Sequence, residues 1–361
     1  MPEPKTEQIA QYLESVLKQD VVVTAVRPLG SSPDSAAEKT YGYGVPLRID
    51  FEISGRSQSA VLHTMHPGPF GHENMADRAQ VLLWQHRAFN RLPRHIHSFD
   101  VGGFEKDGRL IPLGGVEEFC LLTEYADGSP YAADLERLRD RDALAGLDVA
   151  RSDALCDYLA GIHKTPVHHP GLYIRRIREL VGHGECIMGL ADSYPPDPLI
   201  SAQALEDIEH QCIAWRWRLK RYAHRLRKIH GDFHPWNVLF QEGTHFSLLD
   251  RSRGEFGDPA DDVVCLTLNY LFFSLQHTGK LAGWFEYLFE RFWHRYLDQT
   301  GDREILEVAA PYCAFRGLVM ASPVWYPDLA PGVRAKLLYF IQAVLRAPRF
   351  DPSLVNEYCG P

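Results

Sequence analysis

The sequence of 361 residues has no apolar run near the roughly 20 residues that a membrane-spanning helix needs. Its first residues, 1–7, are polar and lack the apolar core of a signal peptide, which predicts a cytoplasmic location. The seven cysteines are scattered, odd in number and without a Cys-x-x-Cys pair. We therefore expect free thiols in a reducing compartment, and neither disulfides nor a zinc site.

Excess positive charge is also missing. The formal net charge is -9, whereas nucleic-acid-binding proteins usually present a basic surface. Hydrophobic residues make up 45% of the chain and charged residues 24%, which is ordinary for a globular protein with an ample core. The composition thus predicts no nucleic-acid partner and no membrane partner, and it leaves the oligomeric state open.

The most informative stretch is His-Gly-Asp-Phe-His-Pro-Trp-Asn at residues 230–237. Asp232 and Asn237 flank four residues, so one loop directs a carboxylate and a carboxamide oxygen toward a common point. Kinase catalytic loops have the same pattern, in which the Asp accepts the proton of the substrate hydroxyl. The spacing predicts that Asp232 is a general base and that Asn237 is a cation ligand.

Asp250 follows a short β-type segment, residues 246–249, which comes after the apolar run 238–240 and a turn. Two such segments joined by a short turn predict a β-hairpin, which returns Asp250 to the side of Asn237. Mg²⁺ prefers one or two carboxylates together with substrate phosphates. Asn237 and Asp250 are therefore the predicted magnesium ligands.

A third block, Gly-Asp-Pro-Ala-Asp-Asp-Val at 257–263, leads into an apolar helix. With the loop at 230–237 and the Leu-Asp pair at 249–250, it resembles the aminoglycoside phosphotransferase and choline kinase-like family. That family shows His-Gly-Asp-x-x-x-x-Asn, an Ile-Asp strand end and Gly-Asp-Pro-x-x-Asp in this order. The resemblance implies that Asp262 caps the following helix and braces the catalytic loop.

The resemblance also implies a two-lobed, protein kinase-like α+β fold. A small β-rich N-lobe is expected over residues 1–126 and a larger helical C-lobe over 127–361. Asp232 is implied as the catalytic base, and Asn237 and Asp250 as the Mg²⁺ ligands. The implied activity moves the γ-phosphoryl group of ATP, with GTP as an alternative, to a hydroxyl of a small molecule.

In such folds a Lys on the third strand holds the nucleotide phosphates and pairs with a helix Glu. By strand phase, the residue nearest to that position is His63, a neutral imidazole without a fixed charge near pH 7. Lys39 or Arg78 is the alternative source of positive charge, and Asp77 and Gln80 are equal candidates for the helix carboxylate position. The opposing interpretation is that His63 only packs in the sheet.

Residues 119–128 are expected to form an apolar strand that ends in a polar turn and marks the boundary between the lobes. In the family this segment is the hinge, where backbone groups hold the adenine. The resemblance gives that role to residues such as Glu124 and Ala126.

Hydrophobic periodicity predicts the remaining elements. Helices are expected over 6–18, 74–90, 153–163, 215–228, 263–276, 284–299, 305–322 and 333–345, and strands over 21–26, 47–53 and 58–65. The basic run inside 215–228 is interpreted as a solvated, ion-paired face, with an anionic-substrate site as the alternative. The Pro-, Gly- and Arg-rich segment 166–198 is expected to depart from a plain helix and to help form the acceptor pocket, and His163 is expected to be a structural hydrogen-bonding residue.

A second hypothesis is a nucleotide-binding regulatory pseudokinase without turnover. His63 favours it, whereas Asp232, Asn237 and Asp250 oppose it because a non-catalytic protein needs neither the base nor both metal ligands. The acceptor stays open among choline, sugars, amino alcohols and macrolides. No acidic run of the kind expected for a polycationic aminoglycoside occurs in the sequence.

Overall fold

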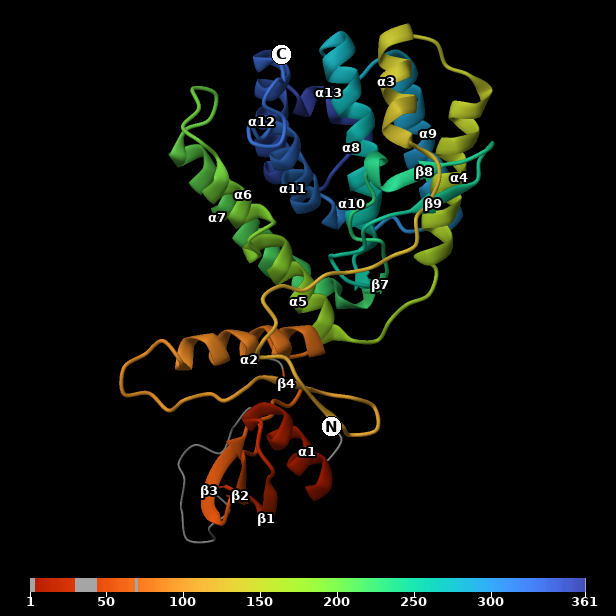
Figure 1. The fold of residues 1–361 in the computed structure, drawn as a ribbon. Helices are drawn as coiled ribbons and strands as arrows, with labels where there is room; N and C mark the ends of the chain where they lie inside the picture. Colours follow the sequence, from red (N-terminus) through yellow and green to blue (C-terminus); the bar gives the residue numbers. More distant parts are fainter. Residues whose placement is uncertain (1–3, 30–43, 69–70, 361) are drawn as a thin grey trace. The chain divides into compact units, whose positions relative to one another are not determined.

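The structure is a computed structural model that describes residues 4–29, 44–68 and 71–360. The chain divides into two compact units, residues 1–123 and 124–361, and each is described by itself. The first unit carries a small β-sheet and the second is mainly helical (Figure 1). This arrangement confirms the predicted two-lobed α+β class. No helix in the described ranges has the length and apolar character needed to cross a membrane.

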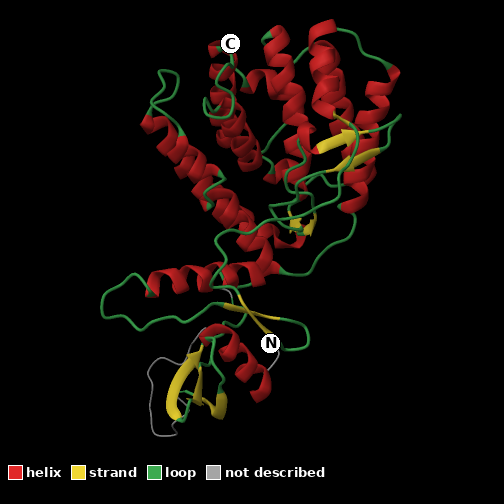
Figure 2. Ribbon diagram, viewed as in Figure 1, coloured by secondary structure: helices red, strands yellow, loops and turns green. Residues whose placement is uncertain are grey.

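The core of the first unit forms where helix α1, Thr6–Leu17, packs on an antiparallel sheet of three strands. Strands β1 (Val22–Pro28), β2 (Leu47–Ile53) and β3 (Arg56–Leu62) lie in the order β1-β2-β3. Figure 2 draws the strands in yellow and the helices in red. Strand β2 alternates between buried and exposed side chains, as a strand with one covered face must. The buried side chains of this core are Ile9, Leu13, Val21, Ile49, Phe51, Ile53 and Leu110.

The rest of the first unit consists of helix α2, Met75–Phe89, and a hairpin of β4 (Gly102–Phe104) and β5 (Leu110–Pro112). The strand predicted over 119–128 is wrong, because the described residues 113–128 contain no strand. A strand requires partners for its backbone N–H and C=O groups, and no neighbouring segment supplies them here.

The second unit is organised around helix α8, Pro259–Thr278, in which every residue from 259 to 275 is buried. A helix that is apolar on all sides belongs in the centre of a core. Helices α3 (Tyr131–Arg141), α9 (Gly283–Thr300) and α11 (Ala310–Ala321) pack against it.

The remaining elements surround this centre. Helix α4 (Gly146–Ile162) packs on α9, and α12 (Pro331–Arg346) packs on α11. Strands β6, β8 and β9 form one small antiparallel sheet in this order, and β7 pairs with β10. The other bounds are α5 Pro170–Gly182, α6 Ile187–Ser193, α7 Ala202–Leu219, η1 Lys220–Arg225, β6 Ser129–Pro130, β7 Arg227–Lys228, η2 Pro235–Asn237, β8 Val238–Phe240, β9 Phe246–Leu248, β10 Phe256–Gly257, α10 Ile305–Val308, η3 Pro352–Leu354 and α13 Val355–Tyr358.

The segment 166–198 departs from a plain helix, as predicted, because α5 ends at Gly182 and α6 begins only at Ile187. Two other predictions for the helices of this unit are wrong. The helix expected over 215–228 begins earlier, at Ala202, and its last residues form the 3₁₀ turn η1. The helix expected over 305–322 is interrupted at Ala309, between α10 and α11.

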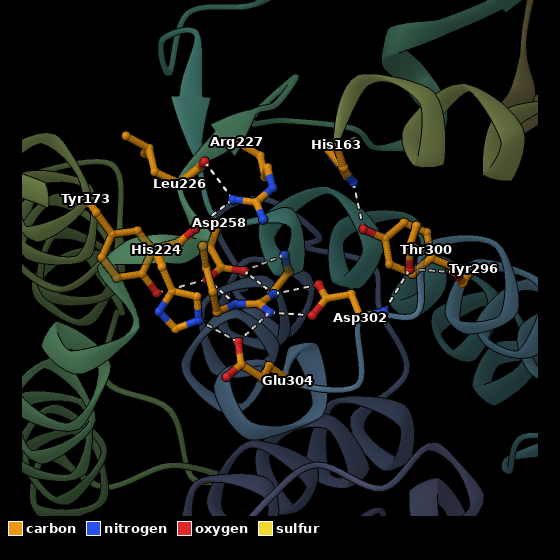
Figure 3. A network of polar contacts seen from close by, with 12 residues as sticks. His163, Tyr173, His224, Leu226, Arg227, Asp258, Tyr296, Thr300, Asp302 and Glu304 are labelled. Carbon is orange, nitrogen blue, oxygen red and sulfur yellow. Dashed lines mark hydrogen bonds and ion pairs between the residues drawn. The ribbon is translucent and has the colours of Figure 1, made fainter. Parts of the chain in front are cut away.

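Arg225 is the centre of a buried ion network. Figure 3 labels the two aspartates that it binds, Asp258 and Asp302. The Arg225 guanidinium donates to both carboxylate oxygens of Asp258 at 2.9 and 3.0 Å, and to those of Asp302 at 2.5 and 2.9 Å. The hydroxyl of Tyr173 donates to Asp258 at 2.8 Å. Arg225 is only 3% exposed, so the prediction of a solvated face is wrong at this residue.

Arg225→Met is expected to lower the free energy of unfolding by about 3–5 kcal/mol, because it leaves the buried Asp258 without its counter-charge. Arg295→Met is the control, since its ion pair with Asp157 is more exposed and should contribute about 1 kcal/mol or less. Urea unfolding at pH 7 measures both. Equal losses for the two variants would show that the network does not stabilise this unit.

Candidate active site

The loop that precedes β8 is held by the carboxylate of Asp262, in the first turn of α8. One oxygen accepts the backbone N–H of His230 at 2.8 Å and the other accepts that of Gly231 at 2.7 Å. Burial opposes ionisation of Asp262, but the bonds from His163 and these two amides outweigh it and lower the pKa of the carboxyl. The prediction that Asp262 braces this loop is confirmed.

The prediction that Asp262 caps α8 is wrong. The N-cap is Asp258, whose carboxylate accepts the backbone N–H of Ala260 at 3.0 Å. Asp262 lies one turn further along the helix, where its side chain reaches the loop instead.

His163 is a structural residue, as predicted. It is buried, and its Nε2 lies 3.1 Å from Asp262 while its Nδ1 lies 2.9 Å from the hydroxyl of Tyr296. Both ring nitrogens are therefore occupied by protein groups.

Gly231 turns the chain immediately before Asp232. Its φ of +88° lies in the left-handed region, which side chains other than glycine rarely adopt. A Cβ at this position would also lie 3.3 Å from the Cβ of Arg253, a tight contact. The glycine therefore allows the backbone conformation that presents Asp232.

Asp232 is mostly buried and surrounded by positive and neutral donors. Arg316 donates to its Oδ1, Arg253 Nε lies 3.9 Å from the same oxygen, and His234 Nε2 lies 3.7 Å from Oδ2. Burial raises the pKa of Asp232, but Arg316, His234 and Arg253 together lower it below its ordinary value. Asp232 is thus ionised at neutral pH and able to accept a hydrogen bond from a hydroxyl.

Arg316 is the residue at this site that the sequence interpretation missed. It lies on α11, is 5% exposed, and donates through Nη2 to the carbonyl of Gly231 at 2.9 Å and to Asp261 at 2.8 Å. Burial raises the pKa of Asp261 despite this contact, whereas the pKa of Asp232 is lowered. The only sequence signal was a lone charge inside the apolar run 310–321.

His234 provides a neutral donor beside Asp232. Its Nδ1 accepts the backbone N–H of Trp236 at 3.2 Å, so the neutral ring carries its proton on Nε2, which is the nitrogen nearer to Asp232. Burial lowers the pKa of His234 although Asp232 opposes the shift. Trp236 itself stacks on Phe273 and belongs to the packing.

The predicted hairpin of β8 and β9 is present and brings the two predicted metal ligands to neighbouring positions. Leu249 N–H donates to the carbonyl of Asn237 at 2.9 Å, so Asp250 follows the last bonded residue. The amide nitrogen of Asn237 donates to the carbonyl of Asp232 at 3.0 Å, which turns the amide oxygen to other partners. One Asp250 oxygen accepts from Ser252 N–H at 3.0 Å.

This donor set fits Mg²⁺, which takes few protein oxygens and completes its shell with phosphate and water. In the part of the chain that the structure describes, no group of three or more His, Cys, Asp or Glu side chains is arranged to hold a metal ion. Two oxygen donors, from Asn237 and Asp250, would suit an ion that is shared with a phosphate ligand.

The residues predicted to contact a nucleotide come from other segments of the chain. His63 is exposed and directly follows β3, and Lys39 lies outside the described residues. Glu124 is exposed and Ala126 is partly buried, both in the segment before β6. Asp77 accepts a backbone N–H at the start of its own helix. Their nucleotide-binding role stays a prediction.

The chain matches the model of the phosphotransferase enzyme family over residues 57–303. No curated protein sequence matches it. Among solved structures it is similar to choline kinase LicA from Streptococcus pneumoniae, with 14% identity, a TM-score of 0.34 and 94% and 98% of the two chains covered. It is also similar to a glucosamine kinase (14%, 0.37, 99% and 84%) and to aminoglycoside phosphotransferase APH(4)-Ia (14%, 0.32, 98% and 97%).

Arg316→Met is expected to raise the pKa of Asp232, because burial then acts without the guanidinium. In the wild type the ionised form persists to lower pH, and in the variant the carboxyl protonates earlier as the pH falls. A ¹³C carboxyl NMR titration measures the change, and Asp232→Asn identifies the signal.

Arg334→Met is the matched control, since Arg334 is an equally buried arginine whose hydrogen bonds among the described residues go to backbone carbonyls. Its loss should leave the titration of Asp232 unchanged. Arg316→Lys, which keeps the charge, should give an intermediate pKa. If the pKa of Asp232 is identical in wild type and in Arg316→Met, the electrostatic role of Arg316 is refuted.

Proposed function

We propose that this chain, which belongs to the phosphotransferase enzyme family, transfers the γ-phosphoryl group of ATP to a hydroxyl group of a small molecule. The observation that carries the proposal is the arrangement around Asp232. An ionised carboxylate lies in a braced loop, and Asn237 and Asp250 follow at neighbouring positions. This is the set of groups that phosphoryl transfer to an alcohol requires.

Asp232 would act mainly by orientation. Arg316 occupies its Oδ1, so Oδ2 is the oxygen that accepts a hydrogen bond from the acceptor hydroxyl. A carboxylate with a lowered pKa is a weak base, and it takes the proton only as the hydroxyl oxygen bonds to phosphorus. Holding the hydroxyl in line with the phosphoryl group accounts for most of the rate enhancement expected from Asp232.

Asn237 and Asp250 would hold Mg²⁺ through the amide oxygen and the carboxylate. When bound, the ion neutralises charge on the phosphates of the nucleotide. The Asn237 amide nitrogen is fixed on the Asp232 carbonyl, so the same contact orients the metal-binding oxygen and the loop.

His63, Lys39, Glu124 and Ala126 are proposed to contribute to nucleotide binding, with ATP preferred and GTP as an alternative. This proposal is supported by the sequence positions of these residues, which correspond to nucleotide-binding positions in the family pattern. The absence of a lysine at His63 favours a second candidate function, a nucleotide-binding regulatory pseudokinase without turnover. Consumption of ATP in the presence of Mg²⁺ and an acceptor library separates the two.

A cytoplasmic location is part of the proposal. All seven cysteines are free, and six of them are buried. Free thiols persist where glutathione and thioredoxin keep the compartment reducing.

Asp232→Asn is expected to lower turnover by about 10²–10⁴-fold, because it removes the proton acceptor, while nucleotide affinity stays within a few-fold of wild type. The rate of ATP consumption is measured with the acceptor that the library identifies. Asp298→Asn, an exposed Asp to Asn change on α9, is the control. Turnover of Asp232→Asn within a few-fold of wild type would exclude the proposed role.

Asp250→Ala is expected to weaken binding of Mg²⁺-ATP by at least about tenfold, because it removes the carboxylate that is proposed to hold the metal. Calorimetric titration is carried out with Mg²⁺-ATP and, separately, with ATP and EDTA. Only the Mg²⁺-dependent part of the affinity should fall. An unchanged Mg²⁺-dependent affinity would show that Asp250 is only a turn residue, which accepts a hydrogen bond from Ser252 N–H.

A further inference from the structure

Arg253 lies beside Asp232 with most of its donors unused. Its side chain is 18% exposed, and among the described residues its guanidinium makes one hydrogen bond, from Nη1 to the sulfur of Cys186 at 3.2 Å. The separation of 3.9 Å between its Nε and Asp232 is too long for a hydrogen bond. A guanidinium has several N–H donors, and the remaining donors of Arg253 are not fully buried, so an anionic ligand can replace water on them.

The position of this guanidinium is defined by its surroundings. Its central carbon lies 4.6 Å from the ring centroid of Phe315, and the guanidinium of Arg316 contacts the same ring at the same distance. The backbone carbonyl of Arg253 accepts a hydrogen bond from Arg176. Arg253 is therefore held at the ring, at the thiol and through its backbone, with its remaining donors available.

The carboxylates near Arg253 already have partners. Arg316 binds Asp232 and Asp261, and Asp262 binds two backbone amides and His163. The Asp232 carboxylate is thus already paired with Arg316, and Asp250 is assigned to the metal. A cationic acceptor would compete with Arg316 for Asp232, whereas an anionic acceptor would meet N–H donors of Arg253 that have no protein acceptor among the described residues.

We propose that the acceptor carries a carboxylate or phosphate group close to its reacting hydroxyl, and that Arg253 binds this anion. The proposal rests on the proposed function, because it assigns the acceptor of the same reaction. The 3.9 Å separation of Arg253 Nε and Asp232 Oδ1 puts both groups within reach of one small molecule, which favours an acidic group close to the reacting hydroxyl. Arginine suits this role because its planar fork matches the oxygens of both groups.

The reaction balances as follows. The acceptor oxygen forms a bond to the γ-phosphorus, and the bond from that phosphorus to the β,γ-bridging oxygen breaks. The hydroxyl proton passes to Asp232, and ADP leaves. The product is a phosphate ester that still carries the original acidic group on Arg253.

Four small alcohols of matched size test the charge preference. These are D-glycerate, glycerol 3-phosphate, glycerol and 3-amino-1,2-propanediol, whose binding is measured by calorimetry with and without Mg²⁺ and a non-hydrolysable ATP analogue. The two anions are expected to bind wild type at least about tenfold more tightly than the neutral and cationic members. Equal or tighter binding of the amine, or no binding of either anion, would overturn the proposal.

Variants locate the preference at Arg253. Arg253→Gln should abolish it, Arg253→Lys should keep part of it, and Arg346→Gln, which removes the same charge from the exposed end of α12, should leave it intact. A preference that survives in Arg253→Gln would remove Arg253 from the anion site.

The transferring phosphoryl group is the other anion that could meet Arg253. If one of the four alcohols is phosphorylated, the proposal expects Arg253→Gln to raise KM for the anionic acceptors by a clearly larger factor than KM for glycerol. An equal fall in kcat for anionic and neutral acceptors, without a change in KM, would assign Arg253 to the phosphoryl group and overturn the proposal.

The proposed function and this inference fail in different ways. In Asp232→Asn the anions should bind as tightly as in wild type or more tightly, since a negative charge beside Arg253 is removed, while turnover is lost. Turnover that persists in this variant contradicts the proposed function alone. Loss of turnover without any anion binding in wild type contradicts the inference alone.

Discussion

The arrangement of the site depends on the buried carboxylate of Asp262. It offers its two oxygens to two consecutive backbone amides, those of His230 and Gly231, and so fixes the loop from which Asp232 projects. Removing a carboxylate from water costs several kcal/mol, on the order of the stabilisation that good hydrogen bonds return in a dry interior. The two amides and His163 supply those bonds, which explains why a fully buried acid is kept there.

The first turn of α8 carries three aspartates with different tasks. Asp258 caps the helix and binds Arg225, Asp261 binds Arg316, and Asp262 binds the loop. Negative charge at a helix N-terminus is also favourable, because the unpaired amides there carry partial positive charge. A single helix end thus connects the ion network of Figure 3 with the loop that presents Asp232, so both depend on the register of α8.

Arg316 and Arg253 give the site its electrostatic character. Arg316 keeps Asp232 ionised against the effect of burial, and therefore makes it a weaker base and a more dependable hydrogen-bond acceptor. Arg253 contacts the same aromatic ring without a carboxylate of its own within hydrogen-bond distance. Arg316 comes from α11 and Arg253 from the segment after β9, so two distant parts of the sequence bring arginines to the Asp232 carboxylate.

Contiguous residues determined much of the structure by themselves: the loop at 230–237, the hairpin that follows it and helix α8 depend on local spacing and periodicity, so the sequence alone predicted them. The tertiary structure decided what depends on partners far along the chain. Arg316 meets Asp232 across 84 residues, Arg225 is buried by Asp258 and Asp302, and residues 119–128 form no strand because no partner lies beside them. The pattern of charged and apolar residues indicates whether a side chain can be buried. Which hydrogen-bond acceptor each buried arginine contacts depends on how the helices pack.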